Sequence, residues 1–236
     1  MLSTNKDVSI KKDATIIEGF PGVGLVASIA TEYLIEHLGA KLIGKMIYKQ
    51  SAPIAAIHNF NVIEPFGIYY SEEKNIVLIH GLSNSRGLEW DIADDIISFA
   101  EQNSVKNIIS LEGVPSNSAT PRNFFYTQNE KLSNMFSKLK AQPIKNGVIL
   151  GVTSALLIKN EHIPQACLFV ESHPSLPDSK GAALLVEDLN YLFEVNIDVK
   201  PLLDQAKIFE DKLKQILTNT KQASEIQKQK ILNYVG

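Results

Sequence analysis

The residues best placed to carry out chemistry form a glycine-rich segment near the start of the chain. Residues 18–24 read Glu-Gly-Phe-Pro-Gly-Val-Gly, and they follow an apolar run and precede a helical pattern. Gly22, Gly24 and Ala27 match the spacing of the dinucleotide fingerprint, in which backbone amides at a helix N-terminus bind a pyrophosphate. Dinucleotide binding is therefore the first chemistry that the sequence suggests.

The rest of that fingerprint is missing. A dinucleotide site needs an acidic residue about 20 positions later, where it binds the ribose hydroxyls. Residues 48–50, at the end of the next predicted strand, are Tyr, Lys and Gln, and a proline precedes the glycine pair. We therefore interpret the segment as a tight strand-to-helix turn, because glycine allows unusual backbone angles. The residues assigned to this structural turn are Gly19, Pro21, Gly22 and Gly24.

Patterns for nucleophilic catalysis and phosphate binding are weak elsewhere in the sequence. Residues 81–85 partly match the nucleophile-elbow motif of hydrolases, Gly-x-Ser-x-Gly, but they lack its final glycine. No glycine is followed by Lys-Ser or Lys-Thr, as it is in a phosphate-binding loop. Cys167 is the one cysteine, so an internal disulfide is excluded, and its aliphatic surroundings are typical of a core residue. We predict no catalytic residues and no cofactor.

Metal binding has equally little support in the sequence. The five histidines are not paired at ligand spacing. His80 and His173 fall at the ends of predicted strands, where they could meet Glu112 or Glu171. Without closer spacing we predict no metal site.

Apolar runs that often end at glycine alternate with helical stripes along most of the chain. This alternation predicts a layered α/β domain with a mostly parallel sheet, in which the aliphatic run 76–79 is a central strand. The predicted strands are residues 14–17, 41–48, 63–70, 76–79, 105–111, 123–127, 147–152 and 165–170. The predicted helices are residues 25–38, 88–100, 130–139, 154–159 and 179–193.

Parallel sheets place ligand sites at the carboxyl ends of their strands. In this sequence those ends lead into polar or glycine-rich loops at residues 19–24, 80–86, 112–117 and 171–178. A small-molecule site in these loops is therefore compatible with the predicted fold.

Composition limits the class of protein further. The chain has 236 residues, 44% of them hydrophobic, and a formal net charge of -3, so a basic surface for nucleic acid is not expected. Residues 1–12 lack the apolar run of a signal peptide, and no stretch reaches the roughly 20 apolar residues of a membrane helix. We predict a cytoplasmic protein that binds neither nucleic acid nor membrane.

The last part of the chain differs from the rest. We divide the chain into an α/β domain (1–200), a helix with near-heptad apolar spacing (201–217) and a polar tether with an apolar tip (218–236). The apolar residues of the tip are Ile231, Leu232, Tyr234 and Val235. Two interpretations stay open, a docking peptide for a partner and a helix that packs back onto the body.

An ordered set of motifs resembles one known family. Besides the glycine-rich turn, the set comprises residues 81–83, 109–113, 146–151, 171–174, 177–178 and 197–203. Together these segments resemble the PAC2 family of proteasome assembly chaperones, especially its archaeal branch, from about residue 16 to residue 217. The resemblance implies a three-layer α/β/α sandwich similar to nucleoside phosphorylases, with no established enzymatic activity. It also implies a homo-oligomer.

The resemblance further implies a partner, the α subunits of the 20S proteasome. The C-terminal tails of related proteins reach these subunits, and they end in a hydrophobic residue, a tyrosine and a last residue of any type. This sequence ends Tyr234-Val235-Gly236, so its tyrosine is third from last, and Tyr234 would take the hydrophobic position. The partner-binding residues implied are Ile231, Leu232, Tyr234 and Val235 for apolar contact and the Gly236 carboxylate for a basic side chain.

Two other functions are alternatives. The first is a nucleoside-phosphorylase-like enzyme or small-molecule binder that uses the loops around Gly22, Ser83, Glu112 and His173. The second is a structural oligomer whose helix from Pro201 self-associates.

Overall fold

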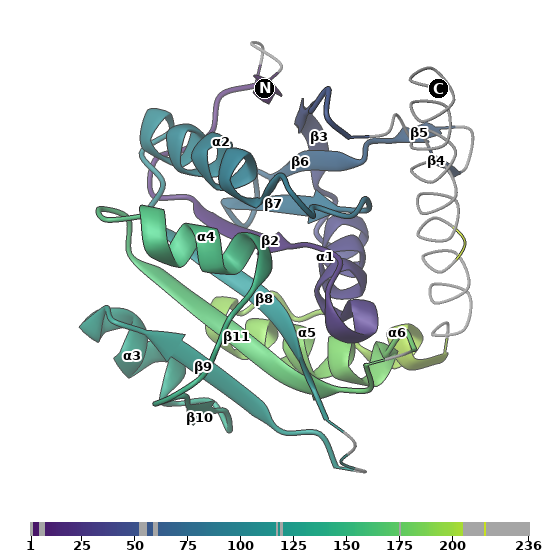
Figure 1. The fold of residues 1–236 in the computed structure, drawn as a ribbon, viewed down its shortest axis with the longest axis vertical. Helices are drawn as coiled ribbons and strands as arrows, with labels where there is room; N and C mark the ends of the chain where they lie inside the picture. Colours follow the sequence, from purple (N-terminus) through teal and green to yellow (C-terminus); the bar gives the residue numbers. More distant parts are fainter. Residues whose placement is uncertain are drawn as a thin grey trace, which may run out of the picture.

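The computed structural model describes residues 2–4, 8–51, 56–58, 61–116, 118, 120–174, 176–204 and 215. These residues form a large sheet with helices on both faces (Figure 1), beside a separate two-stranded hairpin. The strands are β1 (Leu2–Thr4), β2 (Thr15–Gly19), β3 (Lys41–Met46), β4 (Ala56–His58), β5 (Asn61–Ile63), β6 (Phe66–Ser71), β7 (Ile76–Gly81), β8 (Asn107–Pro115), β9 (Asn123–Thr127), β10 (Gln142–Pro143) and β11 (Gln165–Ser172). The helices are the short 3-10 helix η1 (Val23–Leu25) and α1 (Val26–His37), α2 (Glu89–Gln102), α3 (Glu130–Phe136), α4 (Gly151–Lys159), α5 (Ser179–Phe193) and α6 (Lys200–Asp204).

The sheet is parallel at its centre, is flanked by antiparallel pairs on both sides, and ends in a short parallel pair of β9 and β10. Its order is β1-β3-β6-β7-β2-β8-β11-β9-β10. The four strands β7, β2, β8 and β11 are parallel neighbours, as the alternating pattern predicts. Antiparallel pairing of β6 with β7 and of β9 with β11 makes the whole sheet mixed. Strand β7 lies inside the sheet and is buried along its length, as predicted for the aliphatic run 76–79.

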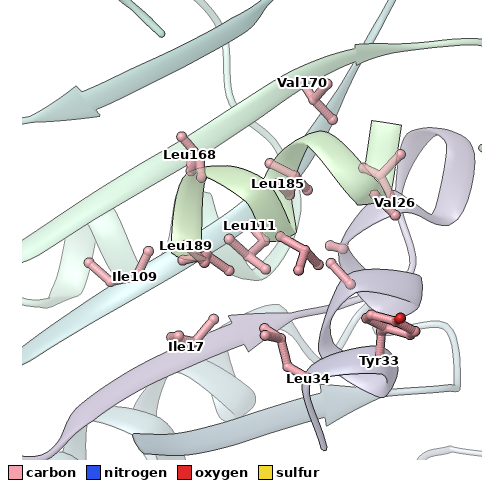
Figure 2. Packing of buried hydrophobic residues seen from close by; sticks show 14 of the residues in the cluster. Ile17, Val26, Tyr33, Leu34, Ile109, Leu111, Leu168, Val170, Leu185 and Leu189 are labelled. Carbon is pink, nitrogen blue, oxygen red and sulfur yellow. The ribbon is translucent and has the colours of Figure 1, made fainter. Parts of the chain in front are cut away.

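Helices α1 and α5 pack side by side on one face of the sheet, and α2 and α4 pair on the other. The three-layer α/β/α sandwich is therefore confirmed. Figure 2 shows the core between the sheet and the α1–α5 layer, where aliphatic side chains of both layers meet. Its labelled members are Ile17, Val26, Tyr33, Leu34, Ile109, Leu111, Leu168, Val170, Leu185 and Leu189. Each such side chain stabilises the fold by about 1.5–3 kcal/mol when it is fully buried.

Alternation along the strands gives each face its own core. Ile17 belongs to the α1–α5 side, whereas Ile16 belongs to the α2–α4 side together with Ile92 of α2 and Leu156 of α4. Successive side chains of a strand point to opposite faces, so a strand covered on both sides is apolar throughout. This is why the central strands read as continuous aliphatic runs.

One predicted strand is wrong. Residues 147–152 were expected to form a glycine-bounded strand, but residues 147–150 have no regular structure and α4 begins at Gly151. Val148 and Leu150 are 89% and 78% exposed, so this apolar run does not enter the sheet. A short apolar run between glycines fits a strand, a loop or the start of a helix equally well, because the run is too short to show the periodicity that separates them. Helix α4 thus includes the predicted short helix 154–159 and extends it at its start.

The C-terminal division of the chain stays a prediction. Helix α6 spans Lys200–Asp204, close to the predicted boundary at residue 200. Residues 205–214 and 216–236, and with them most of the predicted helix and the polar tether, lie outside the described residues. No helix in the described part of the chain is long and apolar enough to cross a membrane.

Candidate functional site

The glycine-rich turn between β2 and α1 brings backbone and side chains unusually close. Gly24 has φ +63°, and a Cβ atom there would lie 1.9 Å from the Ser172 hydroxyl oxygen. A Cβ on Gly19 would lie 2.5 Å from the carbonyl oxygen of Ala27. Lack of space explains why both positions hold glycine, since any side chain there would push α1 away from the sheet. The assignment of this segment as a structural turn stays a prediction that substitutions can test.

Gly22 differs from these two glycines. Its backbone is extended, with φ -140° and ψ -152°, so its conformation does not require glycine. A Cβ atom at this position would lie 3.2 Å from Oε2 of Glu112. Glycine at position 22 therefore lets the backbone of the turn lie close to this carboxyl group, where a Cβ atom would be crowded.

That carboxyl group belongs to a polar cluster between the sheet and α4. The Thr153 hydroxyl of α4 lies 2.8 Å from Oε1 of Glu112 on β8 and 3.3 Å from Oε1 of Glu18 on β2. Glu18 and Thr153 are each 1% exposed, and Glu18 Oε2 has no hydrogen-bond partner in the described part of the chain. The hydroxyl has one proton, so it donates to one carboxyl group, and a protonated carboxyl group can donate to it in turn.

Burial raises the pKa of both acids. Burial raises the pKa of Glu18 to about 8, the charge of Glu112 adds to the effect, and the Ser110 and Thr153 hydroxyls oppose it. Burial likewise raises the pKa of Glu112 to about 7, opposed by the Thr153 hydroxyl. Because the two groups share a hydroxyl, they titrate as a coupled pair. The pKa of the nearby buried Cys167 thiol is raised well above its ordinary value, so the thiol is inert at neutral pH.

A cleft of about 760 Å³ opens beside this carboxyl pair at the carboxyl ends of the parallel strands. Its lining comes from the β2–α1 turn, the β7–α2 loop, the ends of β8 and β11, and residues 146–152. Gly22, Glu112 and Glu171 line it, so loops predicted to meet at the strand ends do meet. Ser83 is 2% exposed and is not part of the lining, and His173 is likewise absent from it.

The sequence allowed His80 to meet Glu112, but the structure places His80 against helix α1. His80 lies 2.8 Å from the Thr31 hydroxyl of α1, on the face of the sheet opposite Glu112. The partner of Glu171 is Arg122, whose Nη2 lies 2.7 Å from Glu171 Oε1. Among the described residues no group of three or more His, Cys, Asp or Glu side chains is arranged to hold a metal ion.

Sequence reasoning missed two members of the cluster, Glu18 and Thr153. Glu18 had a detectable signal, since it is a charged residue inside an otherwise apolar, doubly covered strand. Thr153 had none, because 135 residues separate it from Glu18 and only the packing of α4 brings it there. The predicted partner-binding residues Ile231, Leu232, Tyr234, Val235 and Gly236 lie outside the described residues.

Comparison with known proteins supplies the evolutionary context. The PAC2 family model matches residues 16–217. The structure is similar to Pyrococcus furiosus PbaA, an archaeal homolog of proteasome-assembly chaperone, with a TM-score of 0.82 and 26% identity over 96% of this chain and 100% of PbaA. P. furiosus PbaB, an archaeal proteasome activator, shares the fold, with a TM-score of 0.75 and 22% identity over 92% of this chain and 98% of PbaB. The uncharacterized protein MJ0106 of Methanocaldococcus jannaschii is 27% identical over 203 residues, covering 85% of this chain and 84% of its own.

Proposed function

The chain belongs to the PAC2 family, and from this we propose that it is a non-enzymatic chaperone or adaptor for proteasome assembly. The observation that supports this most is the match to PbaA, which extends over nearly the whole of both chains at 26% identity. PbaA is an archaeal homolog of proteasome-assembly chaperone, and its similarity to this chain in both sequence and fold supports a role of the same class. Because function depends on particular sites and not on the fold alone, the partner and the contacts need their own tests.

The proposed partners are α subunits of the 20S proteasome. The proposed contacts of the tail are apolar, through Ile231, Leu232, Tyr234 and Val235, with the Gly236 carboxylate accepting hydrogen bonds from a basic side chain. An aromatic anchor flanked by aliphatic residues suits a pocket between subunits, because aromatic side chains contribute most to small interfaces. We place the protein in the cytoplasm as a homo-oligomer, in keeping with the family.

A capture experiment tests the partner and the tail together. The full chain is immobilised through its N-terminus and incubated with purified cognate α subunits, with β subunits as the negative control. We expect capture of α subunits by the full chain and markedly weaker capture after deletion of residues 232–236. No capture by either form would refute the partner assignment, and equal capture by both would refute the role of the tail.

Point variants separate the side chains from the carboxylate. Tyr234→Ala should weaken capture, whereas Asn233→Ala, its polar neighbour in the tail, should not. Two alanines appended after Gly236 move the carboxylate and leave every side chain in place. Full capture by the extended chain would exclude a contribution from the carboxylate.

A further inference from the structure

The cleft at the strand ends has the size and lining of a ligand site. Its volume of about 760 Å³ lies within the range of about 300–1,000 Å³ typical of small-molecule pockets. Aromatic and aliphatic side chains from several separate elements form most of its walls, among them Phe20, Phe124, Phe169 and Ile149. A ligand with an apolar body would therefore bury that body well.

The charged side chains of the cleft favour a ligand of one charge over the other. Among the described residues, the charged side chains of the lining are Arg86 and Glu89 on the β7–α2 side, Glu112 at the end of β8 and Glu171 at the end of β11. Glu171 already binds Arg122, which lies outside the lining. Once Glu112 is ionised, Glu89 and Glu112 outnumber the Arg86 guanidinium, so the lining then attracts cations more than anions.

Glu112 is the carboxyl group that the surroundings leave accessible. Its side chain is partly exposed and lines the cleft, and a Cβ atom at position 22 would lie only 3.2 Å from its Oε2. The groups packed around Glu112 from the other elements are Thr153 of α4, Glu18 of β2 and Cys167 of β11, and none of these is a cation. Directly behind it, Glu18 Oε2 is buried without a hydrogen-bond partner in the described part of the chain. Burial without a neighbouring cation favours the protonated form of these two carboxyl groups, and a positive ligand beside Glu112 would favour its ionised form.

We propose that the cleft binds a small organic cation, an ammonium group on an apolar body, with the ammonium group against Glu112 Oε2 and the body against the aromatic walls. Aromatic faces also attract cations, and the Arg122 guanidinium already lies 5.4 Å from the ring centre of Phe124. A metal ion is disfavoured, since the described residues offer no group of three or more ligating side chains. This site is separate from the proposed tail contacts and does not depend on the chaperone role.

Binding of such a ligand must release protons. At neutral pH Glu18, with a pKa of about 8, is mostly protonated, and Glu112, with a pKa of about 7, is protonated in about half of the molecules. An ammonium group stabilises the ionised form of Glu112, so affinity falls by about tenfold for each pH unit below its pKa. The proton linkage distinguishes this site from a surface patch of carboxylates that are already ionised.

Calorimetric titration of the full chain tests the proposal with two matched probes. The probes are 2-phenylethylamine and its neutral counterpart 2-phenylethanol, titrated at about pH 6 and about pH 8, on either side of the pKa of Glu112. We expect the amine to bind at least about tenfold more tightly than the alcohol at the higher pH. Titration in phosphate and in Tris, which differ in ionisation enthalpy, should reveal proton release with the amine alone. Absence of amine binding, or equal affinity for both probes, would overturn the proposal.

Three variants locate the site. Glu112→Gln keeps the shape of the side chain and should abolish the preference for the amine. Gly22→Ala retains the charge but narrows the space beside Oε2, so it should weaken amine binding even if Glu112→Gln folds poorly. Glu101→Gln, which removes an exposed carboxylate of α2 outside the lining, should change the affinity by less than about threefold. A preference for the amine that survives both Glu112→Gln and Gly22→Ala would place the cation elsewhere and refute the assignment.

Discussion

Replacing Glu18 by glutamine should make the protein more stable at high pH and leave it almost unchanged at low pH. Glu18 is 1% exposed and has a pKa of about 8, against an ordinary value of 4.5. Because the folded state holds this proton more tightly than the unfolded state, the stabilising effect is complete below about pH 4.5 and is lost as the pH rises to about 8. Glutamine is isosteric and neutral at every pH, so it removes this loss.

The magnitude follows from proton linkage. One extra proton bound by the folded state lowers the free energy of unfolding by about 1.4 kcal/mol per pH unit. With Glu18 and Glu112 both protonated in the folded state, the slope near pH 6 is about 3 kcal/mol per pH unit, and the variant should show about half of it. Across the full interval the Glu18→Gln variant gains on the order of 3 to 5 kcal/mol relative to the natural chain.

Urea denaturation followed by circular dichroism at several values between about pH 5 and about pH 8 measures these slopes. Glu101→Gln, which removes a carboxylate from the exposed end of α2, controls for the change in net charge. Titrating groups other than Glu112, which is coupled to Glu18, contribute equally to both chains and cancel in the difference. Parallel pH profiles for the natural chain and Glu18→Gln would refute the inference that burial keeps Glu18 protonated.

Three further substitutions test the packing. Gly24→Ala places a methyl group 1.9 Å from the Ser172 hydroxyl oxygen at φ +63°, so it should lower the free energy of unfolding, measured by urea denaturation, by about 2–4 kcal/mol. Gly39→Ala, at φ +55° with open space around it, should lower it by about 1 kcal/mol. Equal losses for the two variants would contradict the close approach at Gly24. Tyr48→Phe removes a 2.8 Å hydrogen bond to an α2 carboxylate and should lower the free energy of unfolding by about 1–2 kcal/mol, and no change in a thermal or urea melt would show that this bond is not formed. Leu185→Ala empties a fully buried position in the core of Figure 2 and should cost about 2–5 kcal/mol by the same measurement, so a cost below about 1 kcal/mol would exclude the α5 packing.

Local patterns were sufficient to predict most of the elements. Strand β9 and helix α5 were predicted with the observed bounds, and α1 ends where Gly39 adopts a left-handed backbone, as the sequence indicates. The central strands were also identified, because burial on both faces leaves an aliphatic run. The run 147–152 was assigned wrongly, since the same composition suits an exposed segment that leads into a helix.

The candidate site was only partly predictable. The glycine-rich turn suggested nucleotide binding, and the missing acidic residue argued against it from the sequence alone. The strand-end rule correctly brought Gly22, Glu112 and Glu171 to one cleft. It wrongly allowed His80 to meet a glutamate, because a register of one residue decides which face of the sheet a side chain occupies.

The sequence by itself determined the order of elements, the central parallel strands and the family, since these follow from periodicity, turn residues and motifs that are local in the chain. Only the tertiary structure decided that Glu18 and Glu112 meet the same Thr153 hydroxyl behind an aromatic cleft. The three residues come from β2, β8 and α4, and their contact depends on strand order and on how α4 packs. No local pattern encodes such a distance, and the raised pKa values exist only because folding removes water from these carboxyl groups.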